Sequence, residues 1–127
     1  MQTRSQLYAQ SAFTRVDLIR AAKAGQPELA QKYGAIALNF PVLILQSGLA
    51  QACGFVLAKQ RQEHLRYLDD LAAVLGEKDG GALHARVIAS SLPDYMHLTR
   101  CTLDAAGWFK RYAQGVLGVE SAEGEAP

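Results

Sequence analysis

The chain has 127 residues, of which half are hydrophobic and a fifth are charged, and its formal net charge is +1. This length is typical of one domain that buries a sufficient apolar core without a disulfide or a structural metal. A protein that binds nucleic acid unaided is usually far more basic, so any such binding is expected to be shared with other subunits. The charge is uneven, because residues 1–66 carry eight Lys or Arg against three acids, whereas the stretch from Glu120 onward carries three acids and no base.

Two features of the sequence indicate a cytoplasmic protein. Cys53 and Cys101 lie within apolar helical patterns, which is typical of buried thiols in a reducing compartment. The sequence does not open on a charged segment followed by an apolar one, as a secretory leader would. We therefore expect a cytoplasmic location.

A first helix is predicted over residues 3–24. Thr3 and Gln6 have the spacing of a capping box, and no proline or glycine interrupts the residues that follow. Four residues at helical spacing form the expected inner stripe: Tyr8, Ala12, Ile19 and Ala22. Arg15 projects into the same stripe, and two interpretations of it stay open. Its stem covers apolar surface, or its guanidinium contacts a phosphate or a partner.

A second helix is predicted from Pro27 to Phe40. Pro27 fits the first turn of a helix, and apolar residues then repeat with the helical period. Pro41 is expected to end this helix, because proline lacks an N–H group and crowds the preceding turn. Asn39 would then cap the helix that follows.

The run from Pro41 to Lys59 is predicted to be the central helix. Between Val42 and Ala58, twelve of seventeen residues are apolar and two are glycines, so the helix would be buried on nearly every side. A membrane span would need about 20 apolar residues with few polar interruptions, and this run is shorter and contains two glutamines. Small or polar residues on one side are expected to admit a neighbouring backbone: Ser47, Gln51, Gly54 and Ala58.

Three further helices are predicted in the C-terminal half, from Leu65 to Leu75, over residues 82–90, and from Pro93 to near Leu117. Asp69 and Asp70 are interpreted as part of a solvated face rather than a metal pair, because adjacent helical side chains point about 100° apart. The last helix has a regular apolar stripe: Tyr95, Thr102, Ala106, Phe109, Ala113 and Leu117.

The predicted fold is all-α, a single-domain bundle of about five to six helices over residues 1–118 around the buried central helix. Residues 119–127 have no apolar period and are expected to form a disordered acidic tail. The sequence contains no Gly-rich phosphate loop and no G-x-S-x-G turn. The three histidines belong to different predicted helices and are expected to be surface or boundary residues. We therefore predict no enzymatic activity, no cofactor and no metal site.

Aromatic and basic side chains interleave in residues 108–112, W-F-K-R-Y. Two interpretations of this segment stay open. The side chains stack on a base and contact a phosphate, or Trp108 is a partly buried core residue and the two cations favour the C-terminal half of a helix dipole.

Several pieces of the sequence occur in an order typical of one family: T-R-S-Q-x-Y-A, then Y-G-A-I-A-L-N-F-P-V-L-I, then S-G-L-A-Q-A, and finally P-D-Y-M-H-L-T-R with W-F-K-R-Y-A. In these pieces the chain resembles the small all-helical subunit of the type III-B CRISPR effector, the fifth protein of the Cmr or RAMP module. The resemblance covers most of residues 2–119.

The resemblance implies a non-catalytic structural subunit that acts in antiviral defence. Several copies are implied to stack as the minor filament of a ribonucleoprotein complex, beside larger RAMP subunits and facing the paired guide and target RNA. The implied partners are other Cmr subunits, further copies of the chain, and guide and target RNA, with no membrane. Repetition of a few phosphate contacts per copy would agree with the modest net charge.

The resemblance assigns four basic residues to contact with the RNA backbone, since they match basic positions of the family pattern: Lys59, Arg100, Lys110 and Arg111. Charge and position alone add Arg61 and Arg66 and, more weakly, Arg15. Which of these residues meet a neighbouring subunit instead is left open.

Two other functional classes are weighed against this one. A stand-alone helical DNA-binding regulator would need an exposed basic recognition helix, for which the short helix after Gly81 offers His84 and Arg86. A small helical enzyme would need a substrate pocket between helices, and such a pocket need not leave a sequence motif.

Overall fold

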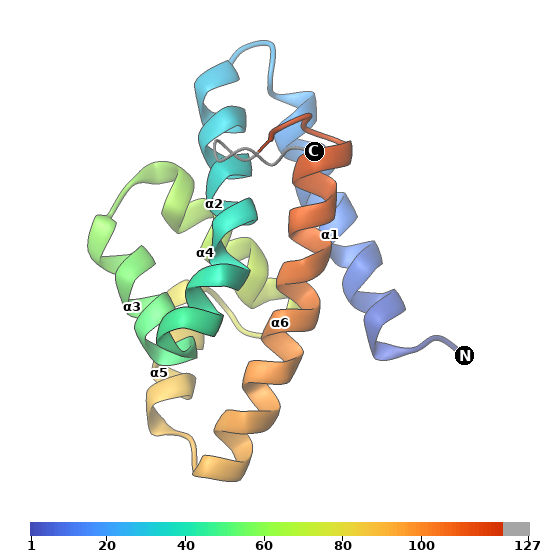
Figure 1. Ribbon diagram of the computed structural model, residues 1–127. Coiled ribbons are helices and arrows are strands. Elements are labelled where there is room, and N and C mark those ends of the chain that lie inside the picture. The colour runs from blue at the N-terminus through green and yellow to red at the C-terminus, as the bar shows by residue number, and fades with distance from the viewer. Residues whose placement is uncertain (121–127) are drawn as a thin grey trace.

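The computed structural model describes residues 1–120, which form six helices and no strand (Figure 1). The helices are α1 (Arg4–Ala21), α2 (Pro27–Ser47), α3 (Leu49–Lys59), α4 (Gln62–Val74), α5 (Gly80–Ala89) and α6 (Leu92–Gly115). The prediction of an all-α bundle is confirmed.

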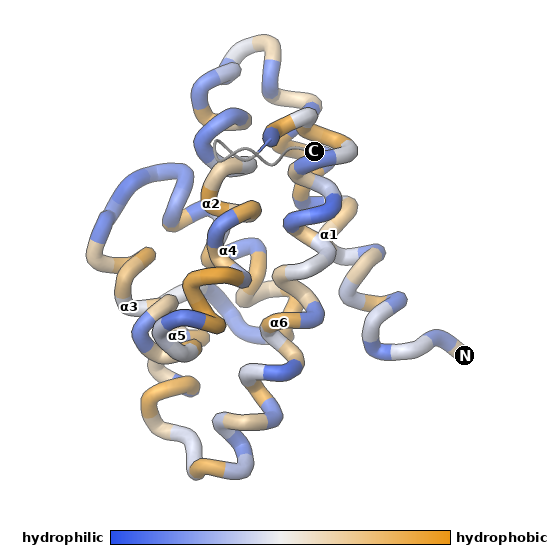
Figure 2. Tube along the Cα trace, viewed as in Figure 1, coloured by the Kyte–Doolittle hydropathy of each residue, from blue (hydrophilic) through white to orange (hydrophobic). Residues whose placement is uncertain are grey.

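Helix α2 lies at the centre of the bundle. It packs against α6, α4 and α3, while α1 lies along α6 on the outer side (Figure 1). The residues that α2 buries include Tyr33, Phe40 and Ile44. Along the trace in Figure 2, hydrophobic residues gather where α2 approaches α3, and hydrophilic residues cover the turn between α3 and α4.

The predicted helix end at Pro41 is wrong, because α2 continues through this proline to Ser47. Ile36, Phe40 and Ile44 are spaced one turn apart and all are buried, so the apolar face of α2 runs without interruption past the proline. The chain breaks instead at Gly48, whose φ of +87° lies in the region that favours glycine. Asn39, expected to cap a helix, is an exposed residue within α2.

The predicted central helix from Pro41 to Lys59 is therefore divided between the end of α2 and all of α3. Leu45, which belongs to the run predicted to be buried on nearly every side, is 73% exposed. The expected ridge of small residues is also wrong, because Ser47, Gln51 and Ala58 are exposed. Gly54 alone of that set faces another helix, and a Cβ built on it would lie 3.9 Å from His84 Nε2, an ordinary contact.

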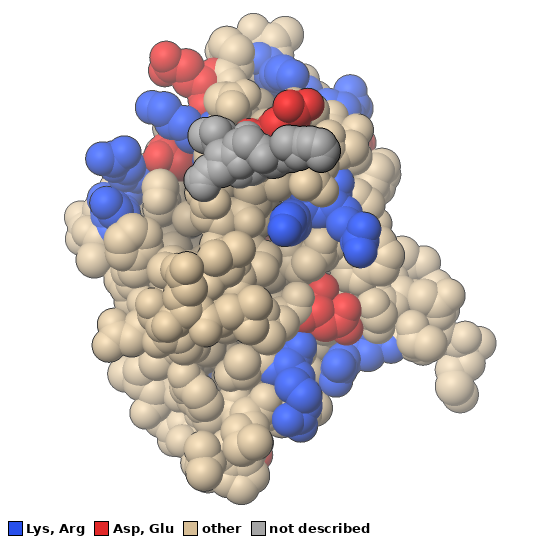
Figure 3. Space-filling model, viewed as in Figure 1, with Lys and Arg blue, Asp and Glu red and all other residues tan. Residues whose placement is uncertain are grey.

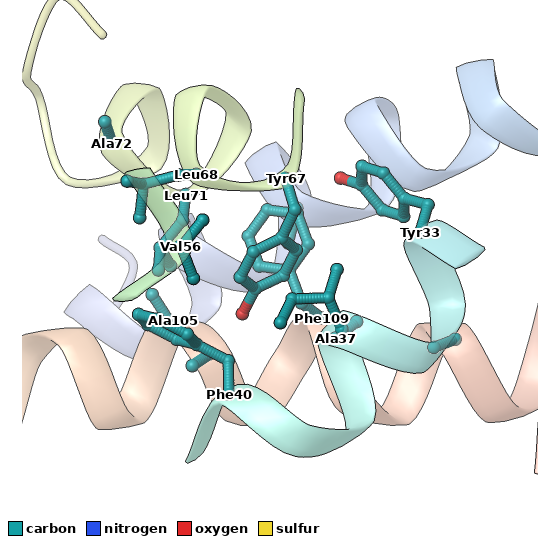
Figure 4. Packing of buried hydrophobic residues seen from close by; sticks show 14 of the residues in the cluster. Tyr33, Ala37, Phe40, Val56, Tyr67, Leu68, Leu71, Ala72, Ala105 and Phe109 are labelled. Atoms are coloured by element: carbon teal, nitrogen blue, oxygen red, sulfur yellow. The ribbon is translucent and has the colours of Figure 1, made fainter. Parts of the chain in front are cut away.

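Aromatic rings join α2, α4 and α6 around Tyr67 (Figure 4). The fully buried Tyr67 ring lies edge-on to Tyr33, Phe40 and Phe109, with centroid distances of 5.8, 5.4 and 5.5 Å. Edge-to-face pairs at such distances stabilise a core beyond their buried area. The Tyr67 hydroxyl finds no hydrogen-bond partner among the described residues, and burial raises its pKa well above the usual value.

Several other predictions of helix ends and core residues are confirmed. The Gln6 N–H donates to Thr3 Oγ1 over 3.0 Å and the Thr3 N–H donates to Gln6 Oε1 over 2.8 Å, which completes the capping box. The stripe predicted on α6 is buried from Thr102 onward, with Tyr95 partly buried. Both cysteines are buried and unpaired. One helix end differs from its prediction, because helix α1 ends at Ala21, three residues earlier than expected.

The segment after α6 folds back onto α2. Val119 is buried, and its N–H donates to the Ala113 carbonyl over 3.0 Å. It packs against Gly34, where an added Cβ would lie 2.8 Å from Val119 Cβ. The tail predicted to start at residue 119 thus begins with a core residue, and residues 121–127 of that tail lie outside the described residues.

Within residues 1–120, none of the helices combines the length and the apolar character that a membrane crossing requires.

Replacing Gly48 with alanine tests the helix break. We expect Gly48→Ala to lower the free energy of unfolding by about 1 kcal/mol or more, because alanine is strained at a positive φ. Gly107→Ala is the matched control: Gly107 lies within α6, and an added Cβ meets no heavy atom within 4 Å. This change should instead raise the free energy of unfolding by about 0.5–1 kcal/mol. Urea unfolding followed by circular dichroism measures both, and equal stabilisation by the two changes would contradict the break at Gly48.

The packing of Gly34 against Val119 is tested with a double-mutant cycle. Gly34→Ala should cost about 1–3 kcal/mol, because the added methyl group overlaps Val119. In a Val119→Ala background the same change should cost less, since alanine lacks the two Cγ atoms, one of which is the closest atom to the added methyl group. Strict additivity of the two changes in urea unfolding would show that the C-terminal segment does not rest on α2.

Candidate nucleic-acid interface

The structure places the seven predicted RNA-contact residues in three locations. Arg15 and Arg66 meet at a buried carboxylate, Lys59 and Arg61 border a groove, and Arg100, Lys110 and Arg111 lie along α6. On the face shown in Figure 3, Lys and Arg form separate groups, over the turn between α3 and α4 and along α6, with a wide uncharged surface between them. The seven residues do not form one continuous basic patch.

The first location is built around Asp70, whose side chain is 8% exposed. The Tyr33 hydroxyl donates to Asp70 Oδ2 over 2.7 Å, and Arg15 Nη1 and Arg66 Nε lie 3.5 and 3.4 Å from the carboxylate oxygens. Burial, followed by the charge of Asp70, raises the pKa of Tyr33 well above its usual value. The prediction of a solvated face is therefore wrong for Asp70, because α4 turns this residue toward α1 and α2. A buried carboxylate needs such partners.

The two arginines at this carboxylate are already engaged within the fold. Their side chains are 35% and 41% exposed, and within the described part of the chain the buried Arg15 Nε has no hydrogen-bond partner. The neighbouring Asp69 plays a separate role, accepting the Gly80 N–H over 2.8 Å at the start of α5. Asp69 and Asp70 therefore have separate partners within the fold.

The second location is an open groove of about 490 Å³ between α2 and the turn from α3 to α4. Lys32 of α2 joins Lys59 and Arg61 there. The sequence prediction missed Lys32, although Lys32, Asn39 and Gln46 repeat every seven residues along α2 and so share a face. The repeat was not recognised because the wrongly predicted helix end at Pro41 places Gln46 in a different helix from Lys32 and Asn39. Apolar side chains also line the groove, and this apolar part of the lining is called its floor below: Ala35, Ile36, Val42, Leu43 and Phe55.

One carboxylate lies among these cations. Glu63 is buried in the groove wall, with His64 Nδ1 at 3.2 Å. Desolvation acts to raise its pKa, but hydrogen bonds from its own backbone and from His64, and the charges of His64 and Lys32, lower the pKa overall. Glu63 is therefore ionised at neutral pH, and three cations face one carboxylate in the groove.

The third location is the outer side of α6. Arg100 and Arg111 are exposed and Lys110 is half-buried. Trp108 is partly buried against the core, its Nε1–H donates to Ser5 Oγ over 2.9 Å, and its ring packs against Tyr112. The interpretation of Trp108 as a partly buried core residue is confirmed.

Helix α5 carries little that would read DNA. His84 is partly buried near Gly54, and Arg86 Nη1 lies 2.6 Å from Glu77 Oε2. In α5, the candidate recognition helix of a DNA-binding regulator, the charge of Arg86 is thus neutralised by Glu77.

His97 and Cys101 were not expected to interact. They lie one turn apart on α6, and Cys101 Sγ is 3.5 Å from His97 Nε2. The i, i+4 spacing is visible in the sequence and is the signal that could have revealed this pair. Among residues 1–120, no three metal-ligating side chains come together.

Comparison with known proteins gives three concordant matches. The family model described as CRISPR-associated protein (Cas_Cmr5) matches residues 4–116, a range that includes all six helices. A Thermus thermophilus protein named CRISPR system Cmr subunit Cmr5 is 40% identical over 117 residues, which are 92% of this chain and 98% of that protein. The X-ray structure of a CRISPR-associated Cmr5 family protein from the same organism is similar with a TM-score of 0.81 and 42% identity, over 91% of this chain and 97% of that one.

Replacing Asp70 with asparagine tests whether its charge stabilises the fold. We expect Asp70→Asn to lower the free energy of unfolding by about 1–3 kcal/mol, because the buried hydrogen bond and both ion pairs lose the negative charge. Asp17→Asn is the matched control, since Asp17 forms a single, largely exposed ion pair with Arg20. Its cost should stay below about 1 kcal/mol. Urea unfolding at neutral pH measures both, and equal costs would contradict a special role for Asp70.

Proposed function

Because the chain belongs to the Cas_Cmr5 family of CRISPR-associated proteins, we propose that it is a non-catalytic structural subunit of a type III-B CRISPR effector complex. Several copies stack as the minor filament beside larger RAMP subunits, in the cytoplasm, and contact the backbone of guide and target RNA in antiviral defence. The observation that carries the proposal is the match to a named Cmr subunit across 92% of this chain and 98% of that protein.

The proposal that the chain is non-catalytic is supported by the structural roles of its carboxylates and of one buried thiol. Asp70 is held by Tyr33 and two arginines, and Asp69 is bonded to the backbone of Gly80. Burial raises the pKa of the Cys53 thiol to about 12, so this thiol is not a nucleophile at neutral pH. These groups maintain the structure instead of facing a substrate.

The RNA-contact part is supported by five cations that form no ion pair with any described residue: Lys59, Arg61, Arg100, Lys110 and Arg111. Contacts with phosphates carry no sequence information and position a strand whose sequence is read by base pairing. A few such contacts per copy give a low affinity, which repetition along a filament multiplies. The proposal therefore requires weak binding by the isolated chain and firm binding by the assembly.

The assembly is tested by affinity purification of the tagged chain from its native cell. Larger RAMP subunits and a guide RNA should co-purify with it, and the isolated chain should not cleave RNA or DNA in single-turnover assays with or without divalent metal. A stable monomer that recovers no such partners would refute the proposal.

The RNA contact is tested by neutralising cations in pairs. Lys110→Gln with Arg111→Gln should weaken binding of the isolated chain to single-stranded RNA, and should reduce the slope of log affinity against log salt by about 0.7 for each phosphate that the chain no longer neutralises. Fluorescence anisotropy over a range of salt concentrations measures both quantities.

The control for that test is Arg15→Gln with Arg66→Gln, which removes the same charge. Since both arginines are paired with Asp70, this double change should lower stability and leave the salt slope unchanged. The opposite result, a reduced slope for the Arg15 and Arg66 variant and an unchanged slope for the α6 variant, would move the RNA contact to the Asp70 region.

A further inference from the structure

The groove between α2 and the α3–α4 turn combines a cationic rim with an apolar floor, which simple phosphate contact does not require. We propose that it binds one unpaired nucleotide of a single-stranded RNA, with the base on the floor beside Phe55 and the adjoining phosphates near Lys32, Lys59 and Arg61. The proposal rests on the RNA contact proposed above and names the part of the RNA that this groove receives.

The size of the groove suits a single nucleotide. Its volume of about 490 Å³ is within the range of about 300–1,000 Å³ that is typical of small-molecule sites. A base with its ribose and phosphate fits such a volume, whereas an RNA duplex or a whole protein helix does not enter it. An RNA strand that enters the groove must therefore expose a single base, which paired strands do not do.

The backbone brings the cations of the rim together. Gln60 adopts the left-handed conformation with a φ of +50°, unusual for a residue other than glycine. This turn lies between Lys59 and Arg61 and leads α4 back along α2, so both cations border the same groove as Lys32. Strained backbone at an exposed site that also gathers charge is typical of ligand-binding turns.

The floor provides a surface for a planar ring. Phe55 is 45% exposed and Val42 is 44% exposed, and both line the groove. Lys59 Nζ lies 5.0 Å from the centroid of the Phe55 ring, so the group that covers this face of the ring is the ammonium of an exposed lysine. A base that stacks on this face displaces the ammonium toward the neighbouring phosphate.

The walls supply hydrogen-bonding groups for the edge of a base. Asn39 and Gln46 are exposed and line the groove with their amides, each of which donates and accepts. The ionised Glu63 faces the same space and repels a phosphate, so the phosphates lie toward the three cations. An acidic peptide would satisfy the cations but would make no use of the flat ring and the two amides together.

The test measures binding of the full chain to a uridine oligomer of about ten nucleotides at low salt, by fluorescence anisotropy. Phe55→Ala should weaken binding by about 5- to 100-fold, as expected for the loss of one base stack. Lys32→Gln, at an exposed position, should weaken binding as well and keeps the test valid if Phe55→Ala unfolds. A ribose–phosphate oligomer of equal length without bases should bind weakly to the native chain and equally to Phe55→Ala.

Two controls lie outside the groove. Leu45→Ala removes a large exposed apolar side chain and Lys78→Gln removes an exposed lysine, and both should leave the affinity within about twofold, since neither residue lines the groove. Uridine monophosphate should displace the oligomer only at far higher concentration. Equal potency of the monophosphate would identify a free nucleotide as the ligand and would overturn the proposal.

The outcomes separate this proposal from the proposed function. If the α6 double variant weakens RNA binding and Phe55→Ala does not, the groove proposal is wrong while the RNA contact stands. If the native chain and every variant bind no RNA, both are wrong. If Phe55→Ala leaves RNA affinity unchanged but prevents co-purification of a larger subunit, the groove receives a protein segment and the proposal is overturned.

Discussion

The continuation of α2 through Pro41 fixes the arrangement of the other helices. A proline inside a helix costs about 3 kcal/mol, whereas full burial of a side chain the size of Phe40 or Ile44 contributes about 1.5–3 kcal/mol each. Since these two side chains lie on either side of the proline and both are buried, the apolar face outweighs the missing hydrogen bond. The helix therefore ends at Gly48, and α3 turns back from there to form the groove with Lys32.

A single carboxylate connects three of the helices that surround this core. Asp70 of α4 is bonded to Tyr33 of α2 and paired with Arg15 of α1 and Arg66 of its own helix. Because each partner satisfies part of a charge that is buried, removal of any one of them leaves the Asp70 carboxylate short of a partner. The pair of arginines that the sequence offers as RNA contacts thus has a role inside the protein, whereas the cations of α6 and of the groove form no ion pair with any described residue.

Much of the fold was predictable from local patterns. The capping box at Thr3, the apolar stripe of α6 and the family resemblance each depend on residues close in sequence or on an ordered set of motifs, and all three are confirmed. The end of α2 was not predictable in this way, since the burial of Phe40 and Ile44 depends on helices far along the chain. Two partners of Asp70, Arg15 and Tyr33, lie far from it in sequence. Local sequence patterns do not predict such long-range contacts. Lys32 was hidden for the same reason, because its place in the groove depends on α2 reaching Gln46 unbroken.

The ring of Tyr67 has a consequence for observing this protein in motion. Three other rings hold it edge-on, and its side chain is fully buried. A half-turn of such a ring requires the surrounding side chains of α2, α4 and α6 to separate for a moment, since the core is packed too densely to leave the necessary space. The four ring protons of Tyr67 will therefore give separate nuclear magnetic resonance signals when this separation is slow. Their merging with temperature will measure how often the three helices move apart.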